Sequence, residues 1–289
     1  MGFQPPRRAA SCASTEGALV GGLSAIKRRI GRALATLRSA ETVCELPAQR
    51  DLPARINTVL TTIYLMFNEG YKAARGHRLM RPELCYEAIR LAELLPSGLP
   101  GERPTIDALL SLMYLNLARF PARTADLGYL LPMEDQDRTR WDQSLIARGI
   151  LHLIRSSVGN MVSRYHIEAA IAACHCAASE YQLTDWQRIL QLYDQLATLV
   201  PTPIVRLNRS VAIYKACGSH AALDVLNEIE ADKAMAGYYL FHAVRAEFLA
   251  DLGDHLAACE AITTAMTLCQ NRVEYDWLVN KRQRLTMPR

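Results

Sequence analysis

The second half of the chain contains an internal repeat. The segments 204–230 and 239–264 superpose with a shift of 35 residues, so that Gly218 aligns with Gly253 and His220 with His255. A period near ~34 residues is typical of the tetratricopeptide unit, in which two helices are joined by a tight turn. Glycine suits the sharp reversal between the two helices. Because units of this kind bury their apolar faces by stacking, the repeat predicts an all-α fold.

The stretch 164–216 fits an earlier copy of the same unit. Its first helical pattern, residues 165–178, is rich in alanine, and small side chains let neighbouring helix axes approach closely. Thr184 and Asp185 form a capping signal for a second pattern, residues 186–199. We therefore expect stacked antiparallel helix pairs, a tetratricopeptide-like solenoid, closed by a last helix from Val273 to Leu285.

Apolar periodicity predicts further helices upstream. One pattern covers residues 54–74 and has Gly70 as a candidate helix stop. Pro82 and Pro104 are placed to open the next two helices at first-turn positions. Residues 122–133 form a longer irregular stretch, which we interpret as a loop or a short hairpin. The connections between the helices are otherwise short, which favours antiparallel neighbours.

The composition is that of a globular protein, with 50% apolar and 21% charged residues. No apolar run approaches the ~18 residues that span a bilayer, and the first residues lack the continuous apolar segment of a secretory signal. The eight cysteines are scattered, mostly within helical patterns, and read as reduced thiols. We expect a cytoplasmic protein with no membrane partner.

The charge is distributed unevenly. Residues 1–50 contain eight Lys and Arg residues against three Glu residues, whereas the remaining chain is nearly neutral. A polyanionic partner would therefore be met at the N-terminus. Four of the basic residues lie mostly off the apolar stripe of a helix predicted between Ser14 and Leu37, where they form either a solvated face or a nucleic-acid contact. They are Lys27, Arg28, Arg29 and Arg32.

Signals for catalysis or metal binding are weak. The thiols of Cys174 and Cys176 flank His175 but lie about 200° apart on a helix, so they do not readily bind one ion. Motifs of nucleotide-binding loops, zinc hydrolases and serine hydrolases are missing from the sequence. The carboxylates of Glu134, Asp135 and Asp137 are interpreted as lying at a helix start, where the dipole favours them; a catalytic carboxylate pair is the alternative. We predict no catalytic residue, metal or cofactor, and no enzyme.

Polar residues inside otherwise apolar helices are better candidates for function. They could bond to one another and fix the helix register, because buried polar groups need partners. They could instead line a concave groove that holds a peptide or a small ligand. The ten candidates are Asn68, Glu69, Tyr71, Gln136, Arg138, Trp141, Tyr165, His175, Asn208 and Arg209.

Seven segments in order along the chain resemble one family. It is the group of bacterial extracytoplasmic-function RNA polymerase sigma factors that carry a long tetratricopeptide-like C-terminal extension. The resemblance covers nearly everything from residue 52 to 285. The segments are IYLMFNEGY (63–71), LCYEAIRLAELL (84–95), ALLSLMYLNLARFPAR (108–123), LLPMEDQDRTRWD (130–142), YHIEAAIAACHC (165–176), TDWQRILQLYDQL (184–196) and PIVRLNRSVAIYKACG (203–218).

The resemblance implies a division of the chain. Residues 1–38 resemble a remnant of the helix-turn-helix domain that reads the −35 promoter element, residues 39–53 a linker, and residues 54–289 the helical-repeat domain. The basic residues from Lys27 to Arg32 would then contact phosphates, which give affinity without sequence information. Gly21 and Gly22 stand where the family has longer polar side chains that could reach bases.

The resemblance also implies partners. The intact factor would bind core RNA polymerase and promoter DNA, and the repeats would bind a regulatory protein. The polymerase-binding sigma domain has no counterpart in this sequence, so we expect the C-terminal part of such a factor, from a truncated gene or a natural split. The alternative is a stand-alone helical-repeat module that binds a protein or ligand and has no role in transcription.

Overall fold

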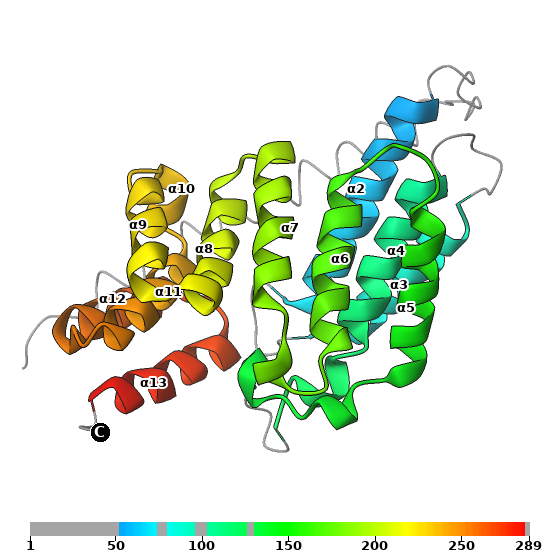
Figure 1. Ribbon diagram of the computed structural model, residues 1–289. Coiled ribbons are helices and arrows are strands. Elements are labelled where there is room, and N and C mark those ends of the chain that lie inside the picture. Colours follow the sequence, from blue (N-terminus) through cyan, green and yellow to red (C-terminus); the bar gives the residue numbers. More distant parts are fainter. Residues whose placement is uncertain (1–51, 74–79, 96–102, 126–129, 287–289) are drawn as a thin grey trace, which may run out of the picture. The chain divides into compact units, whose positions relative to one another are not determined.

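The computed structural model describes residues 52–73, 80–95, 103–125 and 130–286, and from Pro53 onward they belong to one compact unit (Figure 1). These residues form twelve α-helices and no strand, with a single isolated bridge between Thr124 and Leu130. The all-α prediction is confirmed. The predicted helix-turn-helix remnant (1–38), nearly all of the linker (39–53) and the basic residues from Lys27 to Arg32 lie outside the described residues.

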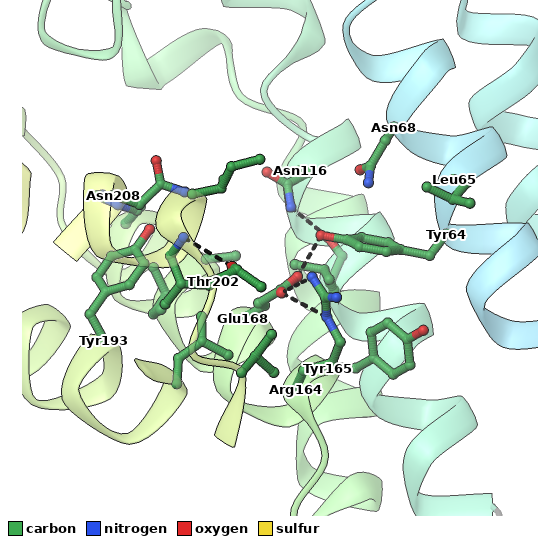
Figure 2. A pocket seen from close by; sticks show the side chains of 18 of the residues that line it. Tyr64, Leu65, Asn68, Asn116, Arg164, Tyr165, Glu168, Tyr193, Thr202 and Asn208 are labelled. Carbon is green, nitrogen blue, oxygen red and sulfur yellow. Dashed lines mark hydrogen bonds and ion pairs between the residues drawn. The ribbon is translucent and has the colours of Figure 1, made fainter. Parts of the chain in front are cut away.

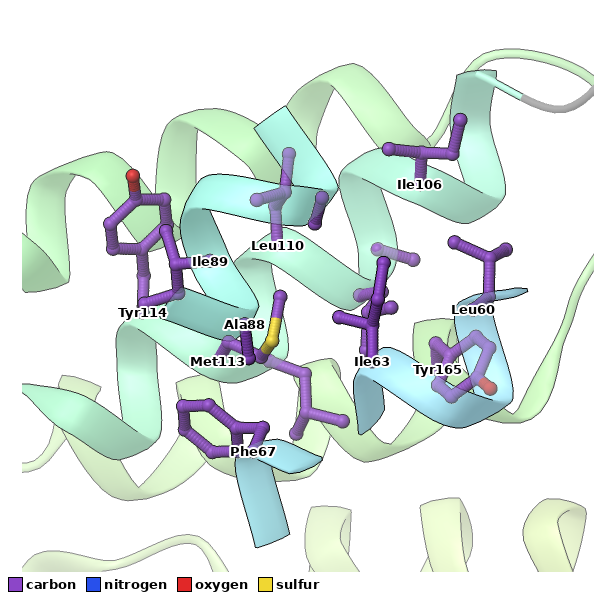
Figure 3. Close-up of a cluster of buried hydrophobic side chains, with 14 of the residues drawn as sticks. Leu60, Ile63, Phe67, Ala88, Ile89, Ile106, Leu110, Met113, Tyr114 and Tyr165 are labelled. Atoms are coloured by element: carbon purple, nitrogen blue, oxygen red, sulfur yellow. The ribbon is translucent and has the colours of Figure 1, made fainter. Parts of the chain in front are cut away.

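The first half of the unit is organised around one central helix. This helix, α4 (Arg103–Leu117), is buried on almost every side because α3, α5 and α6 pack against it. Figure 3 shows Leu110 and Met113 of α4 beside Ile63 and Phe67 of α2 in the shared apolar core. The other helices of this half are α2 (Leu52–Tyr71), α3 (Pro82–Glu93), α5 (Gln143–Ser156) and α6 (Arg164–Ala177).

The second half consists of helices that pack against their neighbours in sequence. Gly218 joins α8 to α9 and Gly253 lies between α11 and α12; both have φ in the left-handed region, at 93° and 84°. The repeat predicted from these two glycines is therefore present in the backbone. The helices are α7 (Trp186–Leu199), α8 (Pro203–Cys217), α9 (Ser219–Ile229), α10 (Lys233–Ala236), α11 (Tyr239–Asp251), α12 (His255–Leu268) and α13 (Arg272–Thr286).

Local capping signals set several helix starts as predicted. The Asp185 side chain accepts a hydrogen bond from the Arg188 amide and caps α7. Pro82 occupies the first turn of α3. Each signal acts within one helical turn, which is why it can be read from the sequence.

The carboxylates at 134–137 do not lie at the start of an α-helix; Glu134 and Asp135 belong to one 3-10 turn and Asp137 caps the next. Met133–Asp135 and Arg138–Arg140 are short 3-10 turns, and α5 begins only at Gln143. The capping residue is Asp142, whose Oδ1 accepts from the amides of Ser144 (2.9 Å) and Leu145 (3.1 Å). The prediction was wrong because this segment turns back toward α6 before the helix starts.

Helix α2 ends at Tyr71, one residue after the predicted stop at Gly70. Gly70 itself lies within the last turn and does not have the left-handed φ of a helix-ending glycine. A Cβ added at Gly70 would lie 2.8 Å from the amide nitrogen of Cys85, so the glycine is needed for the close approach of α2 to α3.

Among the described residues, every helix is too short or too polar to span a lipid bilayer.

Candidate binding pocket

A pocket of about 600 Å³ lies among α2, α4, α6, α7 and α8 (Figure 2). Its volume falls in the range of small-ligand sites. Figure 2 shows Asn208 and Tyr193 on one side and Asn116 and Tyr64 on the other. The polar lining residues are Thr61, Tyr64, Asn68, Asn116, Arg119, Arg164, Tyr165, Glu168, His175, Tyr193, Thr202 and Asn208.

Three of these side chains are hydrogen-bonded to one another at the N-terminal end of α6. The Tyr64 hydroxyl donates to Glu168 Oε2 at 2.5 Å, and Arg164 Nη2 donates to Glu168 Oε1 at 2.7 Å. Burial, together with the Glu168 charge, raises the pKa of Tyr64, so the phenol stays protonated. The charge of Glu168 is therefore already balanced by Arg164 within the pocket.

Arg119 is different, because its guanidinium has no hydrogen bond or ion pair with the described residues. It lies over the Trp141 ring at 5.4 Å, and its Nε is buried without a partner. A cation–π contact of this kind holds a guanidinium in place and leaves its N–H groups free to bind an acceptor. Arg119 is thus an unbalanced positive charge in the pocket wall.

His175 is the second unpaired polar group. Its side chain is only 8% exposed, its ring contacts Trp186 at 5.3 Å between centroids, and its Nδ1 has no partner. Burial, together with the nearby charges of Arg119 and Arg138, lowers the pKa of His175 to about 3. The imidazole is therefore neutral at physiological pH and has one N–H to donate.

Arg138 holds this end of α6 in position. Its guanidinium donates to the carbonyls of His175 (2.7 Å) and Ala178 (2.8 Å) and to Thr184 Oγ1 (2.9 Å). The Arg138 side chain is 8% exposed and stacks on Trp141 at 4.9 Å. One buried cation thus satisfies the last carbonyls of α6 and ties them to the connection leading into α7.

Of the ten polar candidates predicted from the sequence, some line the pocket and the others stabilise the helices through contacts within the protein. Four line the pocket, namely Asn68, Tyr165, His175 and Asn208. The other six hold structure elsewhere: Gln136 donates to the Leu131 carbonyl, Arg138 and Trp141 support α6, and Arg209 pairs with Asp194 at 2.6 Å. Glu69 lies 3.8 Å from Arg81, and Tyr71 packs between Phe67 and Phe120. The binding role of the four pocket residues stays a prediction.

Sequence reasoning missed eight polar residues of the pocket, namely Thr61, Tyr64, Asn116, Arg119, Arg164, Glu168, Tyr193 and Thr202. Arg164 and Glu168 carried a readable signal, since opposite charges four residues apart on a predicted helix form a pair. Asn116 and Arg119 are polar residues three apart near the end of a strongly apolar helical pattern, which also singles them out. Tyr64 and Tyr193 carried none, because an aromatic residue on an apolar helical face looks like core.

The remaining sequence candidates are not gathered into a site. Glu134 lies 3.6 Å from Lys215, and Asp137 accepts from the Thr139 amide at 2.9 Å. In the described part of the chain, no three His, Cys, Asp or Glu side chains are grouped as metal ligands would be.

Comparisons with other proteins give a family match and one relative. Residues 55–157 match a family of unknown function (DUF6596). The chain is 37% identical over 255 residues to an uncharacterized protein of Rhizobium meliloti, and this match covers 88% of the chain and 60% of that protein. The chain thus spans about 60% of the length of this relative. No solved structure matches the chain.

Proposed function

We propose that this chain is the C-terminal helical-repeat region of a sigma-factor-like transcription initiation protein, where it serves regulation and interaction. One observation carries the proposal: six of the seven segments on which the sigma-factor resemblance rests contribute side chains to the same pocket. They are 63–71, 108–123, 130–142, 165–176, 184–196 and 203–218. Segments that share a binding role would be expected to converge in this way.

The length of the relative supports the same proposal. About two fifths of the Rhizobium meliloti protein lies outside the match, which leaves room for a further domain. In a sigma factor that domain would bind core RNA polymerase and promoter DNA in the cytoplasm. The helical pairs of the present chain would then regulate the factor through a ligand in the pocket or a protein on the repeats.

Co-purification from the source organism tests the proposal. The gene is tagged at its 3′ end on the chromosome, so that the chain is captured in whatever length the cell makes it. We expect the core RNA polymerase subunits to co-purify with it, and to do so above the level seen with an unrelated tagged helical protein. Recovery of abundant, folded protein without polymerase would contradict the transcription role.

DNA binding provides a second test, on the basic N-terminal segment. We expect the chain to bind a promoter-length duplex weakly and without sequence preference, because phosphate contacts carry no sequence information. Affinity should fall steeply between two salt concentrations, and neutralising Lys27, Arg28, Arg29 and Arg32 together should flatten that dependence. A sharp preference for one −35 sequence would show that bases are read.

The alternative is a stand-alone binding module. A specific observation favours it, since the pocket is built entirely from residues between Thr61 and Asn208 and needs nothing from the basic segment. Under this alternative, the captured protein would have a ligand but no polymerase.

A further inference from the structure

The pocket has an excess of positive charge. It is lined by two arginines and one carboxylate, and that carboxylate, Glu168, is already engaged by Arg164 and the Tyr64 hydroxyl. Arg119 is left without a counter-charge among the described residues. Because a partly buried charge is costly unless it is paired, an anion at this point would supply what the chain lacks.

A second group points to the same ligand. His175 is more than nine-tenths buried, lines the same pocket and has an unpaired Nδ1. Buried polar atoms are rarely left without a partner in proteins. A neutral imidazole and a guanidinium both donate hydrogen bonds, so the two groups suit an acceptor such as a carboxylate or phosphate oxygen.

Part of the lining is apolar, and this part limits what the anion is attached to. Side chains from α4, α6, α7 and α8 cover this part of the pocket, and a ligand without an apolar body would leave them in contact with water. These residues are Leu112, Ile171, Leu196, Val200, Ile204 and Val205.

We propose that the pocket binds a small organic molecule that bears one carboxylate or phosphate group on an apolar body, with Arg119 and His175 donating hydrogen bonds to the anionic group. This inference rests on the proposed function in so far as the ligand would be the signal that the helical region receives. Binding itself needs neither polymerase nor DNA, so the two proposals are tested separately.

The test uses the full chain and two fluorescent probes that differ by one sulfonate group. 1-Anilinonaphthalene-8-sulfonate has an apolar body with one anionic group, and N-phenyl-1-naphthylamine lacks that group. We expect saturable binding of the anionic probe at one site per chain, and at least roughly tenfold weaker binding of the neutral probe, because hydrogen bonds to a charged group are the stronger kind. Equal affinity for the two probes, or no saturable binding, would overturn the proposal.

Competition distinguishes the two kinds of anionic group. Octanoate or octyl phosphate should displace the anionic probe, and the one that does so at the lower concentration identifies the preferred group. Octanol, with the same apolar body and no charge, should not displace it at matched concentration. Displacement by octanol as readily as by octanoate would show that only the apolar lining matters.

Two arginine variants locate the site. Arg119→Gln should weaken binding of the anionic probe roughly tenfold or more. Arg148→Gln is the matched control, because Arg148 also stacks on an aromatic ring (Tyr114, 4.5 Å) but lies outside the pocket; its binding should stay within about twofold, as for a surface change. Wild-type affinity in folded Arg119→Gln would refute the assignment, and the probe comparison on the wild-type chain decides the proposal if that variant does not fold.

Discussion

Removal of Arg138 should destabilise the protein far more than removal of a neighbouring surface arginine. In Arg138→Met, the methionine keeps much of the buried apolar stem but none of the N–H donors. The carbonyls of His175 and Ala178, at the end of α6, then lose their partner, as does the hydroxyl of Thr184. The acceptors on His175 and Thr184 are buried, so water cannot replace the guanidinium there without opening the structure.

The magnitude follows from three hydrogen bonds and one buried charge. Each bond from a charged donor contributes roughly 1.5–3 kcal/mol. Part of that sum is offset because the variant no longer has to bury a guanidinium, which costs several kcal/mol in a low-dielectric setting. We expect a net loss of about 3–5 kcal/mol in the free energy of unfolding, because three neutral acceptors lose their partner at roughly 1–3 kcal/mol each.

Urea unfolding followed by far-UV circular dichroism measures this loss. With a slope of about 3 kcal/mol per molar urea for a chain of this size, the midpoint should fall by roughly 1 M or more. Arg140→Met is the control, since Arg140 lies in the same 3-10 turn but is exposed, and it should change stability by less than about 0.5 kcal/mol. Arg138→Lys should behave nearly as badly as Arg138→Met, because one ammonium cannot span three acceptors in a planar fork. A midpoint for Arg138→Met indistinguishable from that of Arg140→Met would refute the reasoning.

Three other outcomes are expected. Gly70→Ala should lower the free energy of unfolding in urea by about 1–3 kcal/mol, because its Cβ would meet backbone atoms of Arg81 and Cys85 at 2.8–2.9 Å. Gly237→Ala, which has open space around it, should leave the stability nearly unchanged. Equal effects of the two substitutions would contradict the close-approach argument. Burial raises the pKa of the Cys85 thiol to about 12. At pH 8, Ellman's reagent should therefore label the exposed Cys217 and leave Cys85 unmodified in the folded chain. Rapid labelling of Cys85 would show that the core around it opens easily. The pKa of His175 is lowered to about 3 in the folded state, so its contribution to stability is complete above its ordinary value near 6.5 and is lost as the pH falls toward 3. His175→Phe should therefore lose less stability than the wild type between pH 6 and pH 4. Urea midpoints that fall in parallel for the two chains would contradict this role of His175.

Features fixed within a single turn could be predicted from the sequence. The turns at Gly218 and Gly253, the cap at Asp185 and the proline start of α3 each depend on residues a few positions away. The start of α5 could not be predicted, because the preceding residues are held by Arg138, whose partners lie 37 to 46 residues further along the chain.

The candidate pocket could be predicted from the sequence only in part, because it too depends on contacts between residues far apart in the chain. Polar residues on apolar helices were a sound criterion, yet it could not separate His175, which faces the pocket, from Arg209, which pairs with Asp194 on the surface. Arg119 is a candidate anion-binding residue because no carboxylate among the described residues pairs with it. That lack of a counter-charge is set by the fold and cannot be read from the local sequence.

The span of the pocket has a consequence for how the molecule comes apart. Its wall draws on residues from Thr61 in α2 to Asn208 in α8, and the proposed ligand would touch α4, α6, α7 and α8 together. An array of helix pairs can otherwise fray one pair at a time. A bound ligand would link α4 and α6 to α7 and α8, so that these helices would unfold together in one cooperative transition. The midpoint temperature of that transition should rise with ligand concentration.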